Sequence, residues 1–388
     1  MSNLETRLAA AVDKALDAGV GTGRPVVGAV VRVTIDGQTA YSRAAGYADR
    51  EAGRRLNEDA IFRLASMSKA MVAATTLAMV ERGKLSLTDP VTRFLPDFRP
   101  KLSDGSTPDI LIRHLLSHTS GLTYGFVQKP GHAYQRANVS DGMDQPGLSM
   151  EENLRRIASV PLEFAPATAW GYSMSFDVLG AVIASAGAKT LAKAVAEYVI
   201  RPLGMHDTAF TVADIARLAV PYADGKPEPI RMADTQRVPR PDDPDTALIL
   251  SPARVFDERS FQSGGAGMNG TVADYTTFME VLRLGGSPIL KAETVAMARQ
   301  NQIGTLPREP EDAGLRTSFF AGVVDDPVAA KTPQSAGTLQ FGGAWGHTGF
   351  IDFPRHLSVV CLTNTAVEGV AGNFPITIRD AIYNALAT

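Results

Sequence analysis

The sequence is poor in the features that mark secreted, membrane-spanning and nucleic-acid-binding proteins. It contains one cysteine, Cys361, so no internal disulfide can form, and its apolar neighbours predict a thiol buried in a strand. No apolar run reaches the roughly 18 residues of a membrane span, and the start of the chain lacks the apolar core of a secretory signal. The net charge of -3 creates no strong field for nucleic acid. We therefore expect a cytoplasmic protein with no nucleic-acid or membrane partner.

Several catalytic patterns are missing as well. The chain has no G-x-S-x-G, the nucleophile turn of α/β-hydrolases, and no Walker A phosphate loop. His114 and His118 lie four residues apart on an expected helix, as zinc ligands can, but no glutamate accompanies the first histidine. We expect these two histidines to pack and to form hydrogen bonds. We expect neither a metal ion nor a cofactor.

The patterns that are present place strands at both ends of the chain and helices between them. A β-branched strand at 26–35, the turn Asp36-Gly37 and a second strand predict a hairpin. Neighbouring strands are predicted within 338–352 and 357–366. Helices are predicted from Ser66 to Gly83 and at 109–118, 149–159, 174–187, 190–200, 271–284 (with Thr271 as its N-cap) and 373–386.

This order predicts an α+β fold, with one antiparallel sheet that is built from both termini and flanked by helices. We expect the sheet domain to comprise residues 1–80 and 250–388, with a mainly helical domain, 81–249, inserted between them. Two stretches, about 122–150 and 220–245, show no periodicity. Such long loops usually line or cover a site, although surface insertions are the alternative.

Ser66 and Lys69 form the one S-x-x-K match in a chain with ten lysines. Residues three apart share a helix face, so the amine of Lys69 can reach the hydroxyl of Ser66. A serine hydroxyl becomes a good nucleophile when a base takes its proton, and a lysine can do so where its surroundings favour the neutral amine. The amide of Ser66, at a helix start, is free to stabilise an oxyanion. Alternatively, Ser66 is a helix cap and Lys69 stands there by chance.

From about residue 25 to its C-terminus, the chain resembles the serine β-lactamase and penicillin-binding-protein superfamily. Within it, the chain is most similar to the family VIII carboxylesterases, which look like class C β-lactamases. The segments that carry this resemblance are IFRLASMSKAMVA (61–73), LIRHLLSHTSGL (111–122), WGYSMSFDVLGAVIA (170–184), RPLGMHDTAF (201–210), SGGAGM (263–268) and FGGAWGHTGFID (341–352).

The resemblance implies that Tyr172, in Tyr172-Ser173-Met174, is the third catalytic residue. Its phenol would relay the proton of Ser66 to the leaving group. Met174 stands where the β-lactamases carry an asparagine that helps to bind an amide. Amide substrates are therefore less expected than esters.

The resemblance also implies that His347-Thr348-Gly349 matches the K-T-G strand of the family. Gly349 would let a substrate approach the strand closely, and the amide of Phe350 would be the second oxyanion donor. His347 replaces the lysine, and a neutral imidazole holds a carboxylate poorly. The predicted substrate-binding residues are therefore Trp345, His347, Thr348 and Gly349, and this set favours uncharged substrates.

The function predicted from the sequence is a serine carboxylesterase that hydrolyses short- to medium-chain esters, small molecules, through a Ser66 acyl-enzyme. The alternatives are β-lactamase or D-alanyl peptidase activity, including as a weak side activity, and acyl transfer to an alcohol. A catalytically dead binding protein would have lost Ser66, Lys69 or Tyr172, and all three are present. The sequence leaves open whether Lys69 or Tyr172 is the general base.

Overall fold

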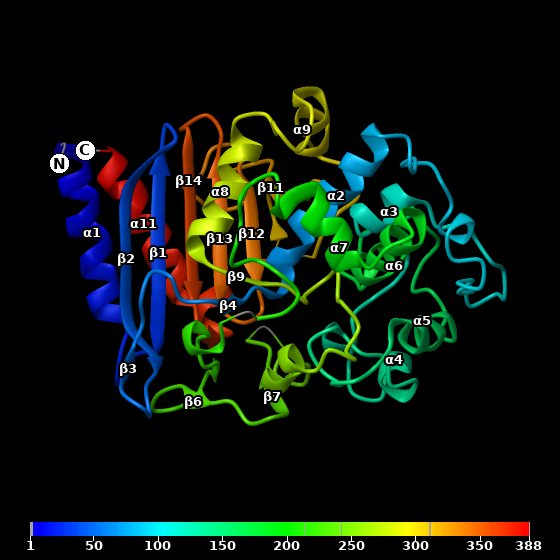
Figure 1. Cartoon of the computed structure of the whole chain (residues 1–388), viewed down its shortest axis with the longest axis horizontal. Coiled ribbons are helices and arrows are strands. Elements are labelled where there is room, and N and C mark those ends of the chain that lie inside the picture. Colours follow the sequence, from blue (N-terminus) through cyan, green and yellow to red (C-terminus); the bar gives the residue numbers. More distant parts are fainter. Residues whose placement is uncertain (1–2, 213, 242, 310–311, 388) are drawn as a thin grey trace.

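The computed structural model describes residues 3–212, 214–241, 243–309 and 312–387. An eight-stranded antiparallel sheet runs through the molecule, and both ends of the chain contribute to it, which confirms the predicted fold (Figure 1). The junction between the two ends is the pairing of β1 with β14, in which Ala29 lies opposite Thr363. In spatial order the strands are β10 (Leu315–Thr317), β11 (Gly322–Val324), β12 (Leu339–Gly343), β13 (His347–Asp352), β14 (Leu357–Thr363), β1 (Gly28–Ile35), β2 (Gln38–Asp49) and β3 (Arg54–Arg55).

Helices cover both faces of this sheet. Side chains of β1 alternate between the two faces, so that Val31 and Val33 pack with the terminal helices while Val30 packs with the central ones. Figure 1 shows the first and last helices side by side, with the two ends of the chain close together. The helices on the sheet are α1 (Asn3–Gly19) and α11 (Asn373–Ala387) on one face, and α2 (Ser68–Glu81) and α8 (Val272–Arg283) on the other.

Local signals in the sequence are matched at two places. The turn between β1 and β2 has Asp36 at φ 51° and Gly37 at φ 81°, the positive values that such a hairpin requires. The side chain of Thr271 accepts a hydrogen bond from the amide of Asp274 at 3.2 Å, which confirms Thr271 as the N-cap of α8.

A helical region lies beside the β11–β12 end of the sheet (Figure 1). Its side chains, for example Leu115 and Val178, share one hydrophobic core with Leu339 and Val360 of the sheet. The division into separate domains therefore stays a prediction. The helices of this region are α3 (Ile112–Leu116), α4 (Ala133–Arg136), α5 (Met150–Ala158), α6 (Ser175–Gly187) and α7 (Leu191–Val195). α3 is shorter than predicted, and α7 continues as a π-helical turn (Ala196–Ile200). α9 (Ala292–Ala298) and α10 (Glu368–Ala371) lie outside the helical region.

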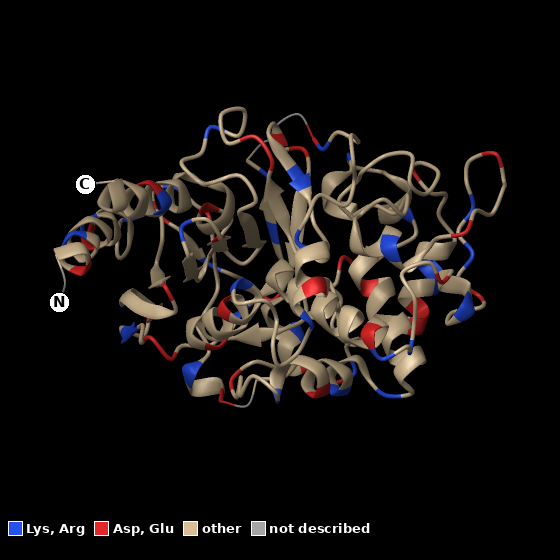
Figure 2. Cartoon of the chain, turned by 90° about the horizontal axis from the view of Figure 1, so that it is seen from above, with Lys and Arg blue, Asp and Glu red and all other residues tan. Residues whose placement is uncertain are grey.

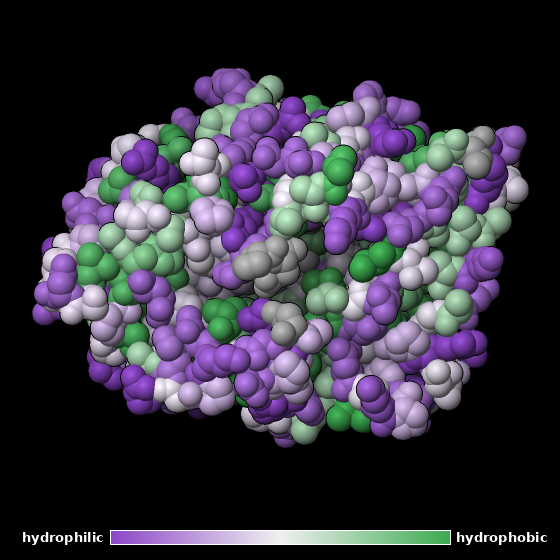
Figure 3. Space-filling model, turned by 180° about the vertical axis from the view of Figure 1, so that it is seen from behind, coloured by the Kyte–Doolittle hydropathy of each residue, from purple (hydrophilic) through white to green (hydrophobic). Residues whose placement is uncertain are grey.

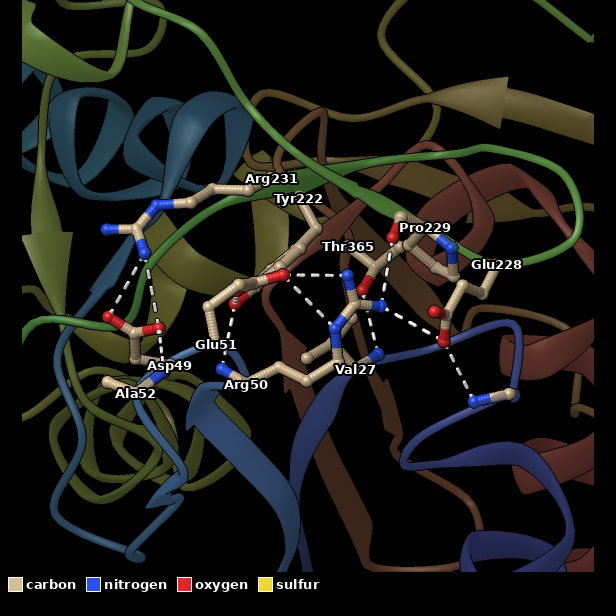
Figure 4. A network of polar contacts seen from close by, with 11 residues as sticks. Val27, Asp49, Arg50, Glu51, Ala52, Tyr222, Glu228, Pro229, Arg231 and Thr365 are labelled. Carbon is tan, nitrogen blue, oxygen red and sulfur yellow. Dashed lines mark hydrogen bonds and ion pairs between the residues drawn. The ribbon is translucent and has the colours of Figure 1, made fainter.

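The first half of the stretch 220–245 is attached to the sheet, although it was predicted to belong with the helical insertion. The hydroxyl of Tyr222 donates to Glu51 at 2.5 Å and accepts from the amide of Arg50 at 2.8 Å (Figure 4). The guanidinium of Arg50 donates to the carbonyl of Pro229 at 3.0 Å. Three small sheets complete the described part of the fold. One comprises β15 (Thr365–Ala366), β5 (Tyr222–Ala223) and β6 (Ile230–Arg231). The other two are the pair β7 (Gln236–Pro239) and β8 (Ala247–Leu250), and the pair β4 (Phe62–Arg63) and β9 (Asn269–Gly270).

Within the described ranges, no single helix has the length and apolar composition needed to cross a membrane. α6 and the helix that follows it meet that test only when taken together, and they are bent by 78°. Lys and Arg residues are interspersed with Asp and Glu residues across the molecule (Figure 2).

Candidate active site

Ser66 lies in a tight turn that leads directly into α2. Ala65–Met67 form a single 3₁₀ turn, and Ala65 has a φ of 45°, a left-handed value that is rare for a residue with a Cβ. In the described part of the chain, neither this turn nor α2 has a side-chain cap. The interpretation of Ser66 as a helix cap is therefore wrong, and its hydroxyl is left for other partners.

Those partners are the two other predicted catalytic residues. Nζ of Lys69, one turn further along α2, lies 3.0 Å from Oγ of Ser66. The hydroxyl of Tyr172, in the loop before α6, donates to the same Oγ at 2.8 Å. The structure thus brings together Ser66, Lys69 and Tyr172 from two regions of the chain that are 106 residues apart.

The surroundings of Lys69 include groups that the sequence analysis did not identify. Nζ donates to the carbonyl of Gly265 at 2.8 Å, and it lies 4.9 Å and 5.3 Å from the ring centroids of Tyr172 and Tyr124. A Cβ at position 265 would lie 2.6 Å from Oδ2 of Asp177 and 2.8 Å from the hydroxyl of Tyr124, so glycine is required there. Gly265 lies in the segment SGGAGM (263–268) that carries the family resemblance, but the contributions of Tyr124 and Asp177 were missed.

A buried histidine orients the loop that carries Tyr172. The backbone amide of Ser173 donates to Nδ1 of His118 at 3.2 Å, and the imidazole ring lies 4.8 Å from the ring of Tyr172. Burial, reinforced by the charges of Lys69 and Arg308, lowers the pKa of His118 well below its ordinary value. A neutral ring is required here, because Nδ1 must accept that hydrogen bond.

The segment predicted to be the K-T-G strand is not the strand next to Ser66. Residues 338–352 form two strands, β12 and β13, because the chain turns at Gly343–Gly346. β12 passes the turn Ala65–Met67, which carries the predicted nucleophile Ser66 and is called the nucleophile turn below, so closely that a Cβ on Gly343 would lie 2.5 Å from the carbonyl oxygen of Leu64. β12 is also paired with β11 only through Leu339 and Gln340, so its 341–343 end has no strand partner on that side within the described residues.

This placement corrects the prediction for Phe350. β13 lies between β12 and β14, with Phe350 opposite Gln340 on one side and Val359 on the other. The amides of a strand paired on both sides belong to the hydrogen-bond ladder. The ring of Phe350 points to the opposite face, where it lies 5.9 Å from the ring of Tyr383. The amide that follows β12, that of Ala344, takes its place as the candidate oxyanion donor.

His347 has a structural role in place of the predicted contact with substrate. It is 1% exposed, its Nε2 lies 2.7 Å from the carbonyl of Arg63, and its Nδ1 accepts from the amide of Thr363 at 3.2 Å. Burial lowers the pKa of His347 to about 4, so the ring is neutral with its proton on Nε2. His347 therefore connects the segment just before Ser66 to β14.

The other predicted substrate-binding residues have different positions. Trp345 is buried and packs over the guanidinium of Arg63 beside a separate pocket of about 280 Å³. Gly349 faces Met67 beneath the nucleophile turn. Thr348 contacts the cavity wall, with Cys361 as its hydrogen-bonding neighbour. Of this predicted group, only Thr348 and Gly349 border the cavity that contains Ser66.

That cavity has a volume of about 980 Å³. Its walls near Tyr172 are largely apolar, and it is bordered by parts of both stretches that lack periodicity. Seen from behind, the molecule is hollowed near its middle, with apolar side chains inside a mostly hydrophilic surround (Figure 3). The apolar wall residues are Leu116, Leu122, Phe126, Phe164, Trp170 and Phe176, and charged residues at its border are Arg240, Arg308, Glu309 and Asp312.

A serine hydroxyl in contact with a lysine amine and a tyrosine hydroxyl, beside a sheet built from both termini, is the arrangement expected of a serine acyl-transferring enzyme. In sequence, residues 9–380 match the beta-lactamase family, and the chain belongs to that family.

Within the family, the chain groups with the family VIII carboxylesterases. It is 48% identical to Esterase EstB of Burkholderia gladioli over 383 residues, which cover 98% of this chain and 96% of that protein. A solved structure described as EstCE1, a hydrolase with promiscuous acyltransferase activity, matches with a TM-score of 0.92 and 39% identity over 98% of both chains. A putative D-alanyl-D-alanine carboxypeptidase of Escherichia coli is 27% identical over 97% of this chain and 90% of its own.

Proposed function

We propose that the chain is a serine carboxylesterase that hydrolyses short- to medium-chain carboxylic esters through an acyl-enzyme on Ser66. The observation that carries this proposal is the pair of contacts on Oγ of Ser66, 3.0 Å from Lys69 and 2.8 Å from Tyr172, at the wall of an apolar cavity. The similarity to Esterase EstB along nearly the whole chain supports an ester as substrate.

In the first half of the reaction, Oγ of Ser66 bonds to the ester carbonyl carbon while its proton passes to Tyr172 or Lys69. The carbonyl oxygen takes up negative charge, and the amides of Ser66 and Ala344 donate to it. The bond to the alcohol then breaks, and the departing oxygen receives the proton. Water repeats these steps on the acyl-enzyme, releasing the acid and returning the proton to Ser66.

Preference for esters over β-lactams is supported by Met174. Its side chain is fully buried in the main hydrophobic core. At the position where the family's β-lactamases carry an asparagine that helps to bind an amide substrate, this chain therefore has an apolar side chain that packs inside the protein. No side-chain amide at position 174 is available to bind a β-lactam.

The decisive experiment combines burst kinetics on a chromogenic short-chain ester with mass spectrometry of the trapped acyl-enzyme. The Ser66→Ala variant should lose the burst and the added acyl mass. Ser68→Ala is the matched control, because the Ser68 hydroxyl accepts from the amide of Met268 at 3.1 Å and, among the described residues, forms no hydrogen bond with Ser66, Lys69 or Tyr172. Full ester turnover by Ser66→Ala would refute the proposal.

A second activity, acyl transfer to an alcohol, uses the same residues, and the description of EstCE1 favours testing it. Adding small alcohols to the ester assay and quantifying the new ester against free acid separates transfer from hydrolysis. Nitrocefin turnover within tenfold of ester turnover would instead support β-lactamase action.

A further inference from the structure

One buried carboxylate beside the site has no role in the reaction described above. Asp177, in the first turn of α6, is fully buried. Its Oδ1 accepts from the hydroxyl of Ser263 at 2.5 Å and, at a longer 3.5 Å, from the amide of Gly265. Among the described residues, its Oδ2 has no hydrogen-bond partner. A buried acid with an unpaired oxygen is costly to the fold, which calls for an explanation.

The geometry around Ser263 indicates that Asp177 is ionised. Oγ of Ser263 accepts from the amide of Ala266 at 2.9 Å, so its own hydrogen is available for Asp177. A distance of 2.5 Å is typical of a hydroxyl that donates to a carboxylate anion. Burial raises the pKa of Asp177 above its ordinary value, although the Ser263 hydroxyl, the charges of Lys69 and Arg254 and the amide of Gly265 lower it.

Asp177 is connected to Lys69 through Gly265. Asp177 holds the turn at Ser263 and Gly265, and the carbonyl of Gly265 receives Nζ of Lys69 at 2.8 Å. The carbonyl oxygen, the faces of the Tyr124 and Tyr172 rings, and the carboxylate of Asp177 all stabilise a positive charge on Nζ.

Other charged groups face Asp177 from neighbouring elements. Arg254, in the 3₁₀ helix Pro252–Phe256, adds a further positive charge, and Asp141, in the 122–150 loop, a further carboxyl. Burial raises the pKa of Asp141 to about 8, so at neutral pH that group is mostly protonated. Asp141 accepts from the amides of Gly125 and Phe126 and, among the described residues, forms no hydrogen bond with the Gly265 turn, which makes it a suitable control.

We propose that Asp177 is a positioning residue of this site: it holds the Gly265 turn that fixes Lys69, and its negative charge acts on Lys69 and Tyr172, the two groups that contact the hydroxyl of Ser66. The proposal rests on the esterase function proposed above. In this proposal, the unpaired oxygen of Asp177 carries negative charge that acts on Lys69 and Tyr172.

The test compares Asp177→Asn, which keeps the shape and an acceptor for Ser263, with Asp141→Asn. A nearby negative charge makes the loss of a proton from Lys69 and Tyr172 harder. Removing the charge of Asp177 should therefore move the acidic limb of the kcat/KM pH profile to lower pH. For Asp177→Asn we expect a shift of about half a pH unit or more, a fall in kcat of about tenfold or more, and KM within about threefold. Asp141→Asn should keep kcat within about twofold and both limbs unchanged.

An unshifted acidic limb in a folded Asp177→Asn variant, or an unchanged kcat, would overturn the proposal. If that variant does not fold, Ser263→Ala decides, because it loosens the turn while keeping the charge: kcat should fall about fivefold or more with the pH limbs in place, and an unchanged kcat refutes the positioning role. Ser66→Ala is assayed in parallel. Retained turnover there would refute the acyl-enzyme function, independently of Asp177.

Discussion

Replacing His347 with leucine distinguishes a substrate-binding histidine from one that holds the backbone. The change removes the hydrogen bonds to the carbonyl of Arg63 and from the amide of Thr363, and both backbone groups stay buried. A buried polar group left without its partner costs about 1–3 kcal/mol. We therefore expect His347→Leu to lower the free energy of unfolding by about 2–6 kcal/mol, measured by urea denaturation at pH 8.

The same variant has a predictable dependence on pH. The pKa of His347 is about 4 in the folded protein and has its ordinary value of 6.5 in the unfolded chain. Between these values the unfolded state binds the extra proton, so the stability that His347 contributes is complete above pH 6.5 and declines as the pH falls. At pH 5 the wild type should have lost about 2 kcal/mol through this residue, and the difference from His347→Leu should shrink by that amount.

Ser358→Ala, on the adjacent strand β14, provides the control. Its hydroxyl is buried and has no hydrogen-bond partner among the described residues, so its removal should change the unfolding free energy by less than about 1 kcal/mol. The reasoning would be refuted if His347→Leu were as stable as the wild type and instead raised KM for esters. That result would mean that the imidazole contacts substrate.

Three further changes test other parts of the site. Tyr172→Phe removes the 2.8 Å contact with Ser66 and should lower kcat about 10²–10⁴-fold in the ester assay, with little change in melting temperature. Gly343→Ala places a Cβ against the carbonyl of Leu64 and should lower kcat about tenfold or more by displacing the nucleophile turn, whereas wild-type kinetics would refute that close contact. Met174→Asn should destabilise the fold by about 1–3 kcal/mol and should not raise nitrocefin turnover, because the amide would be buried in the core.

The features that could be predicted from the sequence depend on short-range patterns. Ser66 and Lys69 are three residues apart on a helical stretch, so their contact follows from helix geometry. The turn at Asp36-Gly37 sets the register of the first hairpin. The β-branched strands at both ends, with helices between them, were sufficient to predict one sheet that contains both termini.

The boundary between β12 and β13 could not be predicted in the same way. The segment 341–352 contains glycines at 342, 343, 346 and 349, so no alternation of apolar and polar side chains marks where one strand ends. A motif match then selected His347-Thr348-Gly349, one strand away from the nucleophile. The error becomes visible only when β12 is seen against Leu64.

Contacts around Lys69 were missed for a different reason. Gly265 is 196 residues from Lys69 in the chain, and Asp177 contacts the Gly265 turn from α6. Such pairs leave no periodic pattern in one sequence, because tertiary folding alone brings them together. Asp177 falls at an ordinary helix-start position, where an acidic residue is already expected from the helix dipole.

Two neutral histidines hold the backbone beside Ser66 and beside Tyr172. His347 binds the carbonyl of Arg63, three residues before Ser66, and His118 binds the amide of Ser173, directly after Tyr172. Each uses Nδ1 to accept a backbone amide, and burial lowers the pKa of each. Protonation would abolish that acceptor: His118 would lose the amide of Ser173, and His347 would lose the amide of Thr363 while its Nε2 still donates to the carbonyl of Arg63. Loss of activity caused by protonation of these histidines should therefore accompany unfolding. The reversible acidic limb of the kcat/KM pH profile should instead depend on Lys69, Tyr172 and Asp177.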